Sequence, residues 1–324
     1  MYDIVSIGNA TQDVFVRIHP KGPIHADKLS IKRGSKIEVL SLERRTGGGA
    51  TNTAVAFARL GLRTGISAVL GKDEAAAAVM KELKEEKVNT KMVSYLKDVG
   101  TAYSVILTGF GDRIVLHYCG ATCEVDYKGD LKWNELKKAK RFYVSSLHAT
   151  PDNLKRIVDF ARNNKIWVAL NPGGVELGYG LKRLEGVLKQ VDLLFLNEEE
   201  AQLLTGRGNY KRAFKELSKY VPLVVITRGQ KGAAACDGKK IYKIGTIKVR
   251  KLDTTGAGDA FNSAFTAAIA QGLGIEEALR WGVANSHSVL GHIGTKNILL
   301  TRAGIKKFWD NASKKDAEVK VGNC

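Results

Sequence analysis

The segment of this 324-residue chain best suited to chemistry on an anionic group is a run of small residues that ends in aspartate, Asp253-Thr-Thr-Gly-Ala-Gly-Asp259. The alanine-rich stretch that follows it predicts a helix. Gly256, Ala257 and Gly258 permit a sharp turn whose amides would face phosphate oxygens from the positive end of the helix dipole. Asp259, in the first turn, could accept a proton from a hydroxyl as a general base. The alternative, in which Asp259 only caps the helix, fits so long a run of small residues less well.

Two other places have glycine, asparagine or aspartate at the end of a predicted strand or the start of a predicted helix. Gly47-Gly-Gly-Ala-Thr-Asn52 is a glycine-rich loop ahead of another predicted helix, and Asp13 follows the first apolar segment. Glycine lets a neighbouring group approach the backbone closely, and the amide of Asn52 can both donate and accept hydrogen bonds. Asn52 could instead only cap the helix. Asp13 is expected at the carboxyl end of a strand, where α/β folds bind ligands.

Strand-like apolar runs alternate with amphipathic stretches, which predicts an α/β fold with a mostly parallel sheet flanked by helices. The expected core strands are residues 3–8, 65–71, 141–147, 166–171, 192–197 and 223–227. The expected helices are residues 51–60, 73–87, 151–164, 210–220, 256–271 and 275–290. Thr150 and Pro151 suit a helix N-cap and first turn. We expect the last residues, 314–324, to fray.

Two segments break this alternation and predict antiparallel strands. In the second of them, residues 103–108 and 113–118 flank a Gly-Phe-Gly-Asp turn, as in a β-hairpin. We therefore expect a small β-sheet inserted in the core. The core would comprise residues 1–13, 43–98 and 121–324, and the inserted sheet residues 14–42 and 99–120. One face of such a sheet should cover a cleft or the same sheet of a second subunit, because an exposed apolar face is a liability.

The chain is strongly basic, with 51 Lys and Arg against 33 Asp and Glu and a formal net charge of +18. Such a charge attracts polyanions, nucleotides or nucleic acid among them. The lysines are spread over predicted solvent-exposed helix faces, however, so we do not expect a nucleic-acid site. No apolar run predicts a membrane span, and the amino terminus lacks a basic leader, which favours a cytoplasmic protein.

The cysteines, Cys119, Cys123, Cys236 and Cys324, are too few for a disulfide framework, and reduced thiols are the expected state. Cys119 and Cys123 are close in sequence. A zinc site would need more ligands at familiar spacing than His117 alone can supply.

Residues 253–265 resemble the carboxy-terminal signature of the PfkB carbohydrate kinases, the ribokinase-like family, and residues 47–62 resemble its amino-terminal signature. A glycine-rich loop alone is weak support. Two signatures in the expected order are strong support, and the resemblance spans residues 2 to about 300. It implies a ribokinase-like, Rossmann-like fold with a β-sheet lid, and phosphoryl transfer from ATP with Mg²⁺. Asp259 would be the catalytic base, and the amides of residues 256–258 would stabilise developing charge.

The resemblance also implies an acceptor site. Asp13 would accept hydrogen bonds from acceptor hydroxyls, and Gly47, Gly48 and Asn52 would line the same pocket. The chain departs from ribokinase at two places near the acceptor. Thr11 stands where ribokinase has asparagine, and Gly49-Ala50 stand where it has lysine and glycine. We therefore expect an acceptor other than ribose.

Further matches concern the nucleotide and metal. Asn197-Glu-Glu-Glu200 resembles the family's Asn-x-x-Glu motif, in which Glu200 would act on Mg²⁺ through water; three glutamates also occur on ordinary exposed helices. The residues expected near the nucleotide are Asn197, Thr227, Gly229, Gly232 and, close to adenine, Asn285. Arg228 could add charge to the phosphates or face water. Asp253 is a candidate ligand for a monovalent cation such as K⁺.

Three functions follow as hypotheses. The first is an ATP-dependent kinase that acts on a hydroxyl of a sugar or sugar-like molecule. The second is a nucleoside kinase of the same fold, in which Phe15, Tyr103 and Tyr118 could stack a base, although such residues are often sheet core. The third is a nucleic-acid-binding protein on a kinase scaffold, since fold does not fix function. The resemblance also suggests a homodimer formed through the lid.

Overall fold

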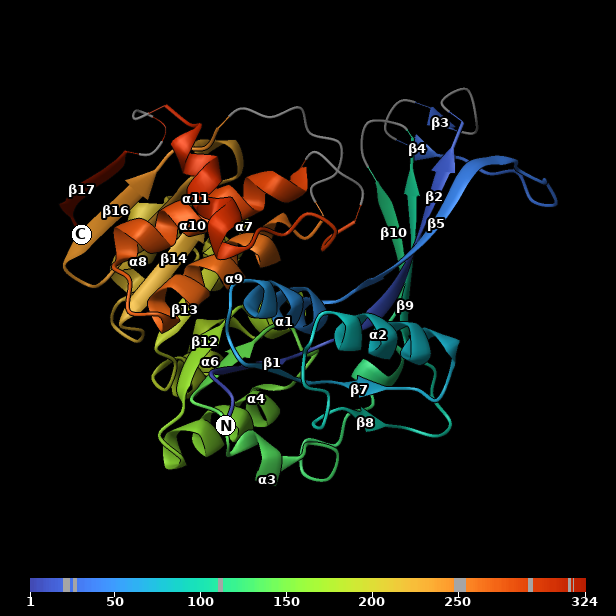
Figure 1. Ribbon diagram of the computed structural model, residues 1–324, viewed down its shortest axis with the longest axis horizontal. Coiled ribbons are helices and arrows are strands. Elements are labelled where there is room, and N and C mark those ends of the chain that lie inside the picture. The colour runs from blue at the N-terminus through green and yellow to red at the C-terminus, as the bar shows by residue number, and fades with distance from the viewer. Residues whose placement is uncertain are drawn as a thin grey trace.

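The computed structural model describes residues 1–19, 24–25, 28–109, 113–247, 255–290, 294–313, 316 and 318–324. In this part of the chain the main feature is a nine-stranded sheet (Figure 1). Its strands, in spatial order, are β17 (Val319–Asn323), β16 (Lys240–Ile244), β15 (Ala233–Cys236), β14 (Leu223–Thr227), β13 (Leu193–Asn197), β12 (Trp167–Leu170), β11 (Arg141–Val144), β1 (Ile4–Ile7) and β6 (Thr64–Ser67). Six strands run parallel, namely β6, β1, β11, β12, β13 and β14. The other three, β15, β16 and β17, are antiparallel and extend the sheet beyond β14.

Helices cover both faces of this sheet. They are α1 (Gly49–Arg59), α2 (Glu74–Glu85), α3 (Trp133–Leu136), α4 (Pro151–Asn163), α5 (Gly174–Gly178), α6 (Gly180–Leu188), α7 (Glu198–Thr205), α8 (Tyr210–Leu217), α9 (Ala257–Ala270), α10 (Ile275–Leu290) and α11 (Arg302–Asp310), with the 3₁₀ turns η1 (Gly120–Thr122) and η2 (Gly229–Lys231).

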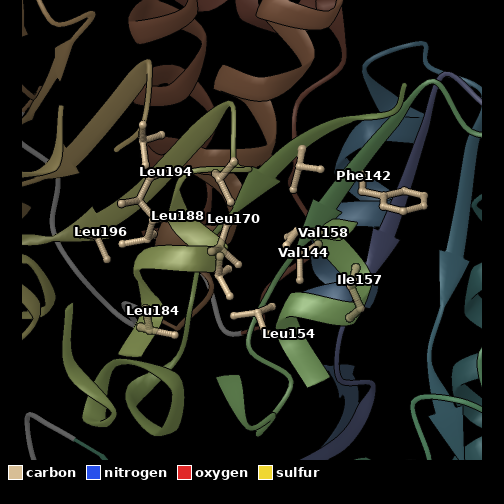
Figure 2. Close-up of a cluster of buried hydrophobic side chains, with 14 of the residues drawn as sticks. Phe142, Val144, Leu154, Ile157, Val158, Leu170, Leu184, Leu188, Leu194 and Leu196 are labelled. Atoms are coloured by element: carbon tan, nitrogen blue, oxygen red, sulfur yellow. The ribbon is translucent and has the colours of Figure 1, made fainter. Parts of the chain in front are cut away.

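The parallel strands are buried on both faces, which explains why they read as apolar runs rather than as alternating patterns. On one face Val144 and Leu170 pack with Ile157 of α4 (Figure 2). On the other face Phe195 meets Phe265 of α9 edge to face, with ring centroids 5.6 Å apart. The apolar core therefore fixes where the strands end, and the candidate site residues follow those ends.

The predicted α/β architecture is confirmed. β14 and α10 have the predicted bounds, and α4 begins as predicted, since Thr150 accepts a hydrogen bond from the Asn153 amide and Pro151 occupies the first turn. The predicted strand over residues 65–71 is divided. β6 ends at Ser67, and β7 (Val69–Leu70) pairs instead with β8 (Ser94–Tyr95).

A separate four-stranded sheet projects from the core, at the right of Figure 1. Its order is β10 (Ile114–Tyr118), β9 (Ala102–Thr108), β2 (Thr11–Ile18) and β5 (Val39–Gly47). The predicted hairpin is confirmed by the antiparallel pairing of β9 with β10. The sheet is not wholly antiparallel, because β2 and β9 lie side by side in parallel. β2 begins before the predicted lid and β5 continues beyond it, so the proposed boundaries at residues 13 and 42 fall inside strands. A short ladder joins β3 (Ile24–His25) to β4 (Lys28–Leu29).

The carboxy-terminal segment was expected to fray, and this expectation is wrong for its last residues. Residues 319–323 form β17, which pairs along its whole length with β16. The physical reason is the exposed edge of β16, whose backbone groups need partners. Cys324 is also disulfide-bonded to Cys236 of β15.

The expectation of reduced cysteines is likewise wrong for this structure. Besides the Cys236–Cys324 bond, Cys119 and Cys123 form a disulfide across η1 with their Cα atoms 5.7 Å apart. Their spacing in the sequence could indicate the Cys119–Cys123 pair. It could not indicate Cys236–Cys324, whose members are 88 residues apart. Among the described residues, no helix combines the length and apolar character needed to span a bilayer.

Candidate active site

Two helix starts that are far apart in sequence meet at Asn52 and Asp259. Nδ2 of Asn52 donates a hydrogen bond of 2.8 Å to Oδ2 of Asp259, and Oδ1 of Asn52 accepts one of 2.7 Å from Oγ1 of Thr295. Asn52 is buried, so the protein itself satisfies both polar atoms of its amide. The N-cap of α1 is Gly48, four residues earlier, so Asn52 is not a helix cap. It orients the Asp259 carboxylate.

Asp259 is the third residue of α9, whose N-cap Gly256 has a left-handed φ of 78°. A Cβ on Gly256 would lie 2.7 Å from the Cβ of Thr295, so this position requires glycine. Ala257 and Gly258 precede the first α-helical hydrogen bond, which the Gly256 carbonyl accepts at 2.9 Å. Their amides therefore lie at the positive end of α9, in the same turn as the Asp259 carboxylate.

The pKa of the Asp259 carboxyl is shifted toward neutral pH. Burial raises the pKa of Asp259 to about 6, while the hydrogen bond from Asn52 and the positive charge of Lys296 act in the opposite direction. A general base is most effective when its pKa lies near the working pH, because it is then ionised and still a good proton acceptor.

Asp13 lies on the lid sheet in a row of polar residues. Strand register places Arg45, Asp13, Ser104 and His117 side by side across β5, β2, β9 and β10. Oδ1 of Asp13 accepts a hydrogen bond of 2.9 Å from Oγ1 of Thr11. Burial raises the pKa of Asp13, whereas hydrogen bonds from Thr11 and Ser104 lower it. Thr11 therefore acts on the Asp13 carboxylate directly.

The two glycines of the first loop allow α1 to approach Asp13 closely. A Cβ on Gly47 would lie 1.9 Å from Oδ2 of Asp13. Gly48 has a φ of 93°, and a Cβ there would lie 2.6 Å from the Asn9 carbonyl oxygen. A side chain at either position would displace the carboxylate or the backbone beside it.

Lys296 is a site residue that the sequence did not reveal. Its side chain is 3% exposed, and Nζ donates hydrogen bonds to the hydroxyls of Thr46 (2.7 Å) and Thr51 (3.2 Å) and forms a 2.9 Å ion pair with Glu82. Burial lowers the pKa of Lys296, and Glu82 opposes that shift. The lysine's charge in turn lowers the pKa of both Asp13 and Asp259. Lysines are almost always exposed, so its type gave no signal.

Asn197 and Glu200 form a reciprocal pair at the start of α7. The Glu200 amide donates to Oδ1 of Asn197 and the Asn197 amide donates to Oε2 of Glu200, both at 2.8 Å. This is a capping box, which explains the Asn-x-x-Glu spacing locally. Burial raises the pKa of Glu200, and the charges of Glu199 and Asp259 add to the shift. The charge of Asp259 thus favours the protonated form of Glu200.

The predicted nucleotide loop follows β14. Thr227 is paired with Asn197 at the carboxyl ends of adjacent parallel strands. Gly229 and Gly232 have positive φ values of 53° and 85°. A Cβ on Gly232 would lie 2.0 Å from the Ile244 carbonyl oxygen, so the return turn requires glycine.

Arg228 does not face water, one of the two alternatives considered for it; the other, added charge near the phosphates, stays a prediction. Its Nε donates a 2.8 Å hydrogen bond to Glu198, and its guanidinium lies 4.0 Å from the ring centroid of Tyr210. The side chain is 18% exposed and is held by these two contacts.

Among the described residues, one predicted site residue remains apart from this cluster. Asn285 is fully buried; its Nδ2 donates to the Ala260 carbonyl at 2.9 Å and its Oδ1 accepts from the Leu300 amide at 2.8 Å. Both polar atoms are used in packing α9, α10 and residue 300 together, so a contact with adenine stays a prediction. Asp253 lies outside the described residues.

Comparison with known proteins agrees with this geometry. The family model of the pfkB family carbohydrate kinases matches residues 4–302. A ribokinase of Lactococcus lactis is 30% identical over 253 residues, which cover 77% of this chain and 81% of the relative. Two solved structures share the fold: Arabidopsis thaliana ribokinase complexed with ribose and ATP (TM-score 0.80, 22% identity, 95% and 99% of the two chains covered) and Methanocaldococcus jannaschii nucleoside kinase (TM-score 0.79, 21%, 96% and 99%). The predicted family, ribokinase-like fold and phosphotransferase class are confirmed, and the chain belongs to the pfkB family of carbohydrate kinases.

Proposed function

We propose that the chain transfers the γ-phosphoryl group of ATP to a hydroxyl of a sugar or sugar-like molecule, with Mg²⁺ as the metal. The observation that carries the proposal is the contact of Asn52 with Asp259, which aims a carboxylate of raised pKa beside the amides of α9. The buried carboxylate of Asp13 lies on the lid sheet.

In this proposal Asp259 accepts the proton of the acceptor hydroxyl at a carboxylate oxygen. Nδ2 of Asn52 donates a hydrogen bond to Oδ2 of Asp259 and so holds the carboxylate in place. The amides of Gly256, Ala257 and Gly258 stabilise negative charge that develops on phosphate oxygens. Asp13, itself held by Thr11, accepts hydrogen bonds from other hydroxyls of the acceptor, so that only one hydroxyl reaches Asp259.

We assign the nucleotide to the strand ends on the other side of α9. The residues are those predicted from the sequence: Asn197, Thr227, Gly229, Gly232 and Asn285. Glu200 would hold Mg²⁺ through water, and a cation there would offset the burial and the charges of Glu199 and Asp259, which raise the pKa of Glu200. ATP supplies the phosphoryl group, and the metal neutralises its charge. A requirement for K⁺ near Asp253 is proposed on resemblance alone and is tested by replacing K⁺ with a bulky organic cation.

A nucleoside acceptor is the second candidate, and a single aromatic residue supports it. Strand register puts Phe15 on the same sheet face as Asp13, with one residue between them along β2. Tyr103 and Tyr118 pair with each other in the adjoining row, on the opposite face. They cannot stack a base held at Asp13. Phe15 is also 4% exposed and packs as core, so we favour the sugar.

The test is ATP consumption with a panel of sugars, sugar phosphates and nucleosides, with Asp259→Asn as the variant. We expect one class of acceptor to support turnover and Asp259→Asn to reduce it about 10²- to 10⁴-fold with nucleotide binding retained. Asp152→Asn is the matched control, because Asp152 also lies in a first helical turn but is exposed. Turnover by Asp259→Asn equal to the control would refute the catalytic assignment. Turnover with nucleosides alone would select the second candidate.

We further propose a homodimer formed through the lid. Leu42 and Leu116 are each 57% exposed, and strand register puts both on the sheet face opposite Asp13. Large exposed apolar side chains gathered on one sheet face favour association. Light scattering should give twice the mass of one chain, and Leu116→Glu should lower the measured mass toward that of one chain. Leu203→Glu, at another exposed leucine, is the control. We place the protein in the cytoplasm, where ATP and Mg²⁺ are available.

A further inference from the structure

Three potential metal ligands meet where the lid joins the core. They are His117, Cys119 and His148, whose ligand atoms all lie within 4.8 Å of one another. The first two are near each other in sequence, but His148 is about thirty residues further along and enters from a different element. Among the described residues this is the group of His, Cys and acidic side chains with the spacing of a metal site.

The backbone brings these side chains together from two parts of the molecule. His117 lies in β10 of the lid, and Cys119 follows directly at the start of η1. His148 lies in the core loop between β11 and α4. Its φ is +54°, a left-handed conformation that is uncommon for a residue with a side chain. The surrounding structure must maintain such a backbone conformation, and conformations of this kind cluster at functional positions.

Cys123 is the candidate for a fourth ligand. Its Sγ is bonded to that of Cys119, and the turn η1 keeps the two Cα atoms 5.7 Å apart. Opening the disulfide frees both sulfurs, of which that of Cys119 lies within 4.8 Å of the ligand atoms of both imidazoles. Bond lengths of about 2.3 Å to sulfur and about 2.0–2.1 Å to nitrogen place tetrahedral ligands about 3.3–3.8 Å apart. The ligand atoms of His117, Cys119 and His148, which lie within 4.8 Å of one another, would have to move closer by up to about 1 Å.

We propose that reduction of Cys119–Cys123 creates a tetrahedral site for a thiophilic divalent cation such as Zn²⁺, bound by both cysteines, His117 and His148. In the redox step a dithiol reductant gives two electrons and two protons to the disulfide and itself becomes a disulfide. Zn²⁺ then displaces the two thiol protons, which are released to solvent. Two thiolates and two imidazoles are a ligand set typical of structural zinc.

Occupancy of this site would connect the lid to the core. Oγ of Ser104 lies 3.3 Å from Nδ1 of His117, and Ser104 also hydrogen-bonds the Asp13 carboxylate. A metal on His117 would therefore fix a residue that adjoins the proposed acceptor site, while His148 anchors it to the core. A hydrogen bond to the second ring nitrogen orients a metal-bound histidine. The expected consequence is a slower exchange of acceptor.

The experiment measures metal binding directly, on untagged full-length protein. The protein is reduced with dithiothreitol, freed of reductant under argon, and titrated with Co²⁺ as a spectroscopic probe, then with Zn²⁺. Reduced protein should bind one Co²⁺ per chain with the intense visible bands of tetrahedral thiolate coordination, which Zn²⁺ then removes. Oxidised protein should give no such bands.

His148→Asn is the decisive variant, because asparagine tolerates the left-handed backbone at this position. We expect its affinity for Co²⁺ to fall at least tenfold, and Cys119→Ser with Cys123→Ser to abolish the thiolate bands. His287→Asn, a histidine on α10 outside the cluster, is the matched control and should bind as the unmodified chain does. Circular dichroism establishes that each variant folds. Absence of thiolate bands in the reduced chain, or unchanged affinity in folded His148→Asn, would overturn the proposal.

Discussion

The hydrogen bond from Asn52 to Asp259 makes a quantitative prediction about the pH dependence of turnover. Asn52→Ala removes this bond, which lowers the pKa of Asp259, so the pKa should rise from about 6. A hydrogen bond to a charged group contributes about 1.5–3 kcal/mol. At about 1.4 kcal/mol per pKa unit, the pKa of Asp259 should rise by about one to two units.

The consequence for catalysis follows from the ionised fraction of Asp259. With a pKa of about 6, roughly nine-tenths of the carboxyls are ionised at neutral pH. A pKa raised by one to two units leaves about a half to a tenth ionised. The acidic limb of kcat/KM should therefore move to higher pH, with a loss of about two- to tenfold at neutral pH that recovers in alkaline buffer.

The assay is the initial rate of ADP formation across pH values, at acceptor concentrations below KM. Thr295→Val is the control, since it removes the donor to Oδ1 of Asn52 and leaves the bond to Asp259 in place. Its limb should shift less than that of Asn52→Ala. If the acidic limb of Asn52→Ala lies at the same pH as that of the unmodified protein and the rate is lower by the same factor at every pH, Asn52 does not set the ionisation of Asp259.

Three further predictions concern residues around this contact. Lys296→Met should also move the acidic limb of kcat/KM to higher pH, because the lysine's charge lowers the pKa of Asp259. It should lower the free energy of unfolding by about 3–5 kcal/mol, because Glu82 loses its ion-pair partner; an unchanged urea denaturation curve would contradict this. Gly47→Ala should raise KM for the acceptor and leave ATP affinity unchanged, since the new Cβ would meet the Asp13 carboxylate; equal effects on both substrates would argue against an acceptor role. Gly232→Ala should weaken nucleotide binding, measured by calorimetry, because its φ of 85° and a backbone carbonyl both exclude a side chain; unchanged affinity would separate this loop from the nucleotide.

The sequence predicted best those elements whose signals are local. α10 and β14 were found with their exact bounds because an apolar period or run ends at clear boundaries. The antiparallel edge formed by β15, β16 and β17 was missed, since Ala233–Cys236 has no alternation and its last partner lies near the end of the chain. Local signals also explain the N-cap of α4 but cannot reveal a strand that pairs across eighty residues.

The same division applies to the site. Asp259 and Gly256 were predicted because small residues before an aspartate have a chemical meaning on their own. Lys296 and His148 were not, because each gains its meaning from partners elsewhere in the chain. Lys296 contacts Glu82 more than 200 positions away, and His148 meets its cluster only after β11 and β10 are placed. Motifs of adjacent residues can therefore be predicted from the sequence more readily than contacts between residues far apart in the chain.

Lys296 also explains how two buried carboxylates can serve one reaction. Burial alone raises the pKa of both Asp13 and Asp259 and would favour their protonated forms. A protonated Asp13 would lose acceptor capacity, and a protonated Asp259 could not accept a proton. The charge of Lys296 opposes both shifts, while the negative charge of Glu82 acts on the lysine and is not among the influences on either aspartate. The ion pair is thus asymmetric: Glu82 favours the charged form of Lys296 despite its burial, and Lys296 favours the ionised forms of the two aspartates.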